Sequence, residues 1–89
     1  MRDTDLFGSL RQVEGVVEVY QKTSFQCYRR GKAGRVQEVQ VDILDAGADA
    51  SSGSRYTCVA HAASGKATVG KPGPSVDAAL ATINWGSLD

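Results

Sequence analysis

Two segments of alternating side chains, joined by a short glycine-containing turn, constrain the fold of this chain most. The segment 23–30 places Phe25 and Cys27 on one face. The segment 35–45 alternates in the same way and groups three branched residues, Val39, Val41 and Ile43. Successive side chains of a strand point to opposite faces, and the sequence Gly-Lys-Ala-Gly at 31–34 is typical of a turn. We therefore predict an antiparallel hairpin with one solvent-exposed face and one apolar face, and we expect Cys27 to lie in the core.

The residues before this hairpin follow a helical spacing instead. Intervals of 4, 3, 4 and 3 separate the apolar residues Leu6, Leu10, Val13, Val17 and Tyr20. Gly15 and the β-branched residues after it disfavour a longer helix. We predict a helix over about 4–14, and leave 16–21 open between helix and strand.

The second half of the chain predicts further strands and a closing helix. After an aperiodic loop at 46–54, we expect a third strand over 55–63 and a short fourth strand over 67–70. Ser75 is a good N-cap for a helix that ends near Trp85, with Gly86 in the left-handed position after it. The order predicts a single α+β domain spanning 1–89. Its sheet has three to four antiparallel strands, with the N- and C-terminal helices packed on one face.

Residues 56–83 carry a resemblance to known families. The strand, the Ser-Gly-Lys turn, the short strand and the Ala-Ala-rich helix resemble the second half of a double-stranded-RNA-binding domain, and are similar to small antitoxins of the HicB type. The first resemblance implies the fold of a double-stranded-RNA-binding domain (a dsRBD-like fold), and the second implies a protein partner. In RNA-binding members, lysines at the start of the last helix grip phosphates. Here residues 74–77 read Pro-Ser-Val-Asp, so RNA binding does not carry over.

The charge balance argues against several classes of protein. Ten basic and ten acidic residues give a formal charge of zero, whereas phosphate binding is favoured by a basic excess. We expect no membrane span, because no apolar run approaches about 20 residues. The polar residues 1–5 do not resemble a signal peptide, and two cysteines are too few for a disulfide scaffold. We expect a cytoplasmic protein with free thiols, and the excess of Val over Ile suggests a GC-rich bacterial or phage source.

No constellation in the sequence predicts catalysis or a bound metal. Cys58 and His61 are three apart on a predicted strand and so point to opposite faces. Glu38 and Asp42 lie on the same face of a predicted strand, but we expect both carboxylates to be exposed, which does not favour a catalytic pair. The segment 70–75 has proline where a phosphate loop needs Ser or Thr. We therefore expect no enzyme, no cofactor and no metal site.

The remaining candidate site is the basic turn of the hairpin. Four cations fall within seven residues, Arg29, Arg30, Lys32 and Arg35. They suit a solvated turn first and an anionic partner second, and the adjacent Tyr28 adds slight support to the second because Tyr and Arg dominate interface hot spots. Trp85 either caps the core or anchors a partner. We predict a small non-catalytic protein–protein interaction module, with a homodimer among its forms and the specific partner open. The alternative is a nucleic-acid-binding module that uses the 29–35 hairpin.

Overall fold

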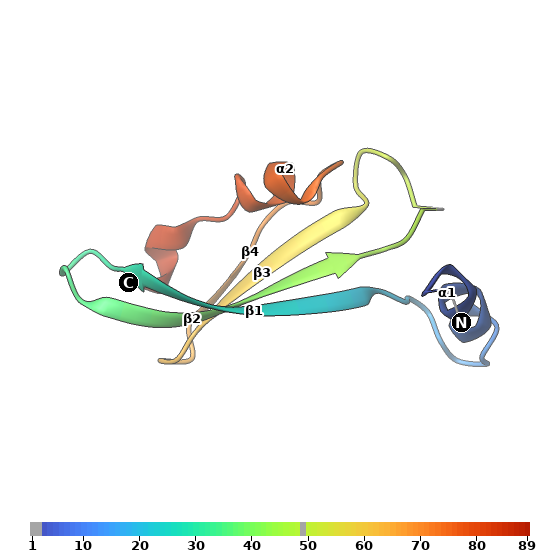
Figure 1. Ribbon diagram of the computed structural model, residues 1–89, viewed down its shortest axis with the longest axis horizontal. Coiled ribbons are helices and arrows are strands. Elements are labelled where there is room, and N and C mark those ends of the chain that lie inside the picture. Colours follow the sequence, from blue (N-terminus) through green and yellow to red (C-terminus); the bar gives the residue numbers. More distant parts are fainter. Residues whose placement is uncertain (1–2, 49) are drawn as a thin grey trace.

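Four antiparallel strands form one meandering sheet in the computed structural model, which describes residues 3–48 and 50–89 (Figure 1). Each strand pairs with the next along the chain, and the four are β1 (Gln21–Arg30), β2 (Val36–Asp45), β3 (Tyr56–Ala62) and β4 (Ala67–Val69). The predicted hairpin is confirmed, and Gly34 takes a φ of +80° in its turn. Of residues 16–21, for which the sequence allows helix or strand, 16–20 are neither and Gln21 begins β1.

Short helices flank the sheet, so the α+β class is confirmed. They are α1 (Asp3–Arg11), α2 (Val76–Leu80) and the 3-10 helix η1 (Trp85–Leu88). Ser75 caps α2 as predicted, since its hydroxyl accepts a hydrogen bond of 3.1 Å from the Ala78 N–H. The predicted role of Gly86 is wrong: α2 stops at Leu80, and Gly86 lies inside η1 without a positive φ.

The core lies between one face of the sheet and the C-terminal helices. α2 contacts β3, and η1 contacts β3 and β4. Most of the buried side chains are small: Val39, Val41, Cys58, Ala60, Ala62, Ala79, Ile83 and Leu88. The best-covered part of the sheet is therefore its β2–β3 centre.

The inward face of β1 remains uncovered. Phe25 pairs with Val41 and Cys27 with Val39, so both lie on the face that carries the core. Phe25 is nevertheless 51% exposed and Cys27 is also exposed. The prediction that Cys27 is a core residue is wrong. The reason is that α2 has only five residues and sits over β3, two strands away.

Helix α1 lies beyond the N-terminal end of β1, not over the sheet face on which α2 packs (Figure 1). The Arg11 guanidinium donates a hydrogen bond of 2.8 Å to the Ala46 carbonyl. The Phe7 ring also lies beside Gly47, where a Cβ would meet it at 3.6 Å, an ordinary van der Waals distance. These contacts give an elongated molecule of 47 × 23 × 23 Å. α1 is the longest described helix, and its nine residues fall short of the length that crosses a bilayer.

Candidate partner-binding surface

Large apolar side chains are exposed along the N-terminal part of the chain. Ten such residues are exposed in the described ranges, and eight of them fall between residues 6 and 28. We call the six that precede β1 the N-terminal apolar segment: Leu6, Leu10, Val13, Val16, Val17 and Tyr20. Val17 is the extreme case, with 93% of its surface exposed. Scattered apolar residues are normal on a protein surface, whereas contiguous exposed apolar patches are typical of interaction sites.

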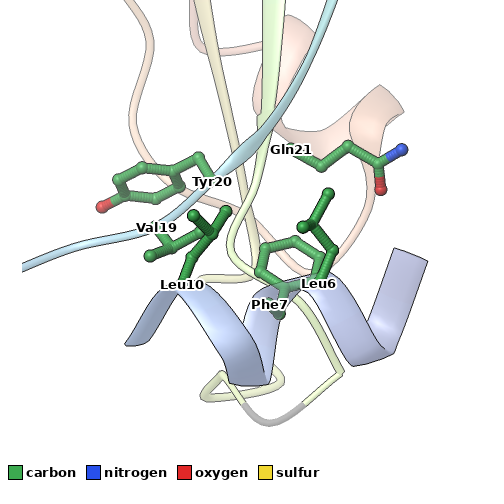
Figure 2. A pocket seen from close by; sticks show the side chains of 6 residues that line it. All are labelled: Leu6, Phe7, Leu10, Val19, Tyr20 and Gln21. Carbon is green, nitrogen blue, oxygen red and sulfur yellow. The ribbon is translucent and has the colours of Figure 1, made fainter. Parts of the chain in front are cut away.

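A small apolar pocket opens within this region (Figure 2). Leu6, Phe7 and Leu10 rise from α1 toward Val19 and Tyr20 in the connector that leads into β1. The cavity measures about 90 Å³, well below the roughly 300–1,000 Å³ of small-molecule sites. A pocket of this size suits the insertion of an apolar side chain from a partner.

The N-terminal apolar segment leads directly into β1, which is an edge strand of the sheet. β1 ends the sheet order, and its ten residues contain no proline, glycine or acidic side chain. The Gly31 N–H donates to the Arg35 carbonyl at 2.9 Å, which directs the odd-numbered backbone groups of β1 toward β2. By the alternation of antiparallel pairing, the even-numbered residues present their N–H and C=O groups outward. Such an edge is a template for another strand.

The predicted basic residues do not form one surface. Arg29 lies on the core-facing side, where it makes a 2.8 Å ion pair with Asp89 and a 2.9 Å hydrogen bond to Gln37. The Lys32 backbone N–H also donates to the Asp89 carboxylate, at 3.1 Å. These two hydrogen bonds, of which the one from Arg29 has the larger effect, hold the pKa of Asp89 below its usual value. Lys66 donates to the Asp89 backbone carbonyl, so the turn between β1 and β2 and the turn between β3 and β4 lie at the same end of the sheet.

The other predicted site residues spread over both faces. Tyr28 is 66% exposed and lies with Arg30 on the face opposite the core. Arg30 donates to the Gly34 carbonyl within its own turn, at 2.9 Å. Arg35 is exposed beside the same turn. Trp85 is half-buried and packs against the core.

A polar cluster on the open face was missed by the sequence reasoning. Asp42, expected to be exposed, is only 6% exposed. Its carboxylate accepts hydrogen bonds from Ser24 at 2.7 Å and Gln40 at 2.9 Å, and lies 3.1 Å from the His61 ring. The bonds from Gln40 and Ser24 lower the pKa of Asp42. The direct pairing of Ser24 with Asp42 in the hairpin register was the signal that could have revealed it.

The chemistry of this cluster is that of a cross-strand tie. A nucleophilic serine passes its proton to a histidine, which a carboxylate then orients. Here the carboxylate lies in the middle, and the Ser24 hydroxyl donates its hydrogen bond to the carboxylate and not to the histidine. The cluster joins β1, β2 and β3, and contributes to the stability of the sheet.

Cys58 and His61 lie on opposite faces of β3. Cys58 pairs with Ile43 on the core face, whereas His61 pairs with Gln40 on the open face, as the spacing predicts. Burial raises the pKa of the Cys58 thiol. Among residues 3–48 and 50–89, no group of three or more His, Cys, Asp or Glu side chains is arranged to hold a metal ion.

No family model, no curated protein and no solved structure matches this chain.

Proposed function

We propose that this protein is a non-catalytic protein–protein interaction module that binds through the N-terminal apolar segment and the free edge of β1. The observation that carries the proposal is the uneven distribution of exposed apolar side chains, eight of ten of which lie within residues 6–28. Leaving this surface in water is unfavourable by about 25 cal/mol per Å². A partner that covers it therefore gains free energy without any change in the folded sheet.

The form of the surface also favours a protein partner. A strand edge offers backbone hydrogen bonds, and neighbouring apolar side chains supply specificity, which is the logic of strand addition. The cavity of about 90 Å³ beside α1 suits one inserted side chain. Two free thiols, one of them exposed, suit a reducing compartment, so the cytoplasm is the proposed location.

Nucleic-acid binding through the 29–35 hairpin stays the alternative and has less support. Arg29 and Lys66 both contact Asp89, and Arg30 bonds its own turn. Phosphate contacts would have to replace these interactions. The resemblance of residues 56–83 to RNA-binding domains and HicB-type antitoxins also remains a prediction.

The proposal is tested with two matched variants. Phe25→Glu places a charge on the uncovered face of β1. Val69→Glu places the same charge on β4 at the opposite edge, where Val69 is 64% exposed. We expect association, with itself or with another protein, to be lost in Phe25→Glu and kept in Val69→Glu. Sedimentation over a range of concentrations and capture from a cell extract measure the two forms of association. A chain that associates with nothing, or one equally affected by both variants, contradicts the proposal.

A further inference from the structure

A row of core-facing side chains crosses the sheet and stops at its open edge. Thr68 pairs with Ala60, Ala60 with Val41 and Val41 with Phe25. At the β3 position of this row Ala60 is fully buried, whereas Phe25 at the β1 end is half-exposed. One more strand with an apolar residue opposite Phe25 would continue the row.

The sequence of β1 is complementary to itself in one antiparallel register. With Phe25 opposite Phe25 of a second copy, the other directly opposed pairs are Gln21–Arg29, Lys22–Tyr28, Thr23–Cys27 and Ser24–Gln26. No like charges are opposed, and the two aromatic rings meet at the centre, a favourable cross-strand pair. Centring the axis on Gln26 instead would oppose Lys22 to Arg30, a destabilising pair of like charges.

Charges beyond the ends of β1 favour the same antiparallel arrangement. The chain before β1 carries the exposed acidic residues Glu14 and Glu18, and the turn after it carries Lys32 and Arg35. Antiparallel pairing places the acidic end of each copy beside the basic turn of the other. A parallel alignment would bring like charges together. The complementarity therefore identifies a second copy of this chain as the occupant of the edge.

We infer that two copies pair through β1 in an antiparallel manner about a two-fold axis at Phe25. The result is one continuous eight-stranded sheet, since each copy contributes four strands. The covered faces of both copies lie on the same side, and the two Phe25 rings bridge the gap between the two sets of C-terminal helices. This inference rests on the proposed interaction function and names its partner.

Disulfide trapping tests the register with Phe25 left intact. In Thr23→Cys, the new thiol lies opposite the native Cys27 of the second copy, so oxidation forms two symmetric cross-links. Within one chain these two positions are about 13 Å apart, four residues along a strand. That distance is beyond the roughly 7 Å between Cα atoms that a disulfide can span. We expect Thr23→Cys to yield a covalent dimer that a reductant reverses.

Two controls share the exposed Cys27 but belong to other registers. Gln21→Cys can form a disulfide with Cys27 of the second copy only when the two-fold axis lies at Ser24. The wild-type chain can join Cys27 to Cys27 only when the axis lies at Cys27. We expect both to cross-link at least about tenfold more slowly than Thr23→Cys, because their thiols do not meet in the inferred register. Equal cross-linking of all three proteins, or faster cross-linking of a control, overturns the inference.

Charge reversal gives an independent measurement in solution. Lys32→Glu should weaken self-association and make it less sensitive to salt, and the double variant Lys32→Glu/Glu18→Lys should restore it. Light scattering that gives a monomer at every concentration overturns the self-pairing. The proposed function would still stand in that case if the wild-type chain captures another protein that Phe25→Glu does not. If the chain also captures no other protein, both proposals fail.

Discussion

The Ser24 hydroxyl donates a 2.7 Å hydrogen bond to the buried Asp42 carboxylate, directly across the β1–β2 pair. The same carboxylate lies 3.1 Å from the His61 ring on β3. β1 receives no cover from α2, so this tie on the open face is one of the interactions that hold the edge strand to the sheet. A charged residue that the alternation assigns to water thus has a structural role.

Replacing the Asp42 carboxylate should destabilise the sheet. In Asp42→Asn an amide NH₂ replaces one acceptor oxygen, so one of the donors around it loses its partner. We expect a loss of about 1–3 kcal/mol in the free energy of unfolding at pH 7, from urea titration. Glu38→Gln is the control, an exposed carboxylate on the same strand and face. It should change stability by less than about 0.5 kcal/mol.

The stability difference between wild type and Asp42→Asn should also depend on pH. Hydrogen bonds lower the pKa of Asp42 in the folded state, so its contribution is fully present above the unfolded pKa of about 4. That contribution is lost as the pH falls through the lowered, folded-state pKa. The stability difference between wild type and Asp42→Asn should therefore shrink below pH 4. A difference that is constant from pH 7 to pH 3 would contradict this assignment.

Gly70 is predicted to tolerate no side chain. A Cβ there would lie 2.6 Å from the Thr82 hydroxyl oxygen and 2.9 Å from the Ala79 carbonyl oxygen. The hydroxyl can rotate away, but the carbonyl belongs to Ala79, a buried residue inside α2. Thermal unfolding of Gly70→Ala should show a loss of about 1–3 kcal/mol. A Cβ at Gly53 would meet none of the atoms of residues 3–48 and 50–89 within 4 Å, so Gly53→Ala should be neutral or slightly stabilising. Similar effects of the two substitutions would contradict the packing.

The two thiols should react at very different rates. Cys27 is exposed on β1, whereas Cys58 is fully buried and its pKa is raised by that burial. Because the thiolate is the reactive form, a chromogenic disulfide should modify one thiol quickly and the other slowly in the native protein. Both should react quickly in denaturant, and Cys27→Ser should lack the fast phase. A single fast phase of two thiols in the native protein would rule out the buried position of Cys58.

Duplex RNA and DNA are expected to bind weakly, even at low salt. Four phosphate contacts on DNA would give a log–log salt slope of roughly −3.6. Arg29 is held 2.8 Å from Asp89, so its engagement with phosphate would break an existing ion pair. Titration of labelled duplexes and single strands at two salt concentrations measures this. Steep salt-dependent binding that disappears in the Arg29→Glu/Arg30→Glu variant would favour the alternative function.

Local patterns in the sequence were sufficient for the strands. The alternation through Val39 and Val41, the glycine-containing turn at 31–34 and the Ser75 cap each depend on near neighbours, and the structure confirms them. The opposite orientations of Cys58 and His61 follow from strand geometry alone. These features could be predicted because the period of a strand and the geometry of a turn are set by adjacent residues.

Features that depend on distant elements could not be predicted. Gly15, with a φ of +88°, was a local sign that the first helix ends before it, but no local pattern shows that α1 packs beside Gly47. Nothing local to Phe25 shows that α2 is too short to cover it. The candidate surface arises from this mismatch between an apolar pattern and the available cover, which becomes visible only when the elements are placed in space.

The uncovered state of β1 also means that this edge of the sheet opens more easily than its centre. Amide hydrogens exchange fastest where few buried contacts must be broken, so β1 should exchange before the central strands β2 and β3. Local unfolding would detach the hairpin edge while the β2–β3 centre and α2 stay folded. Any association along β1 would then slow exchange in this edge strand, and would couple partner binding to the order of the strand.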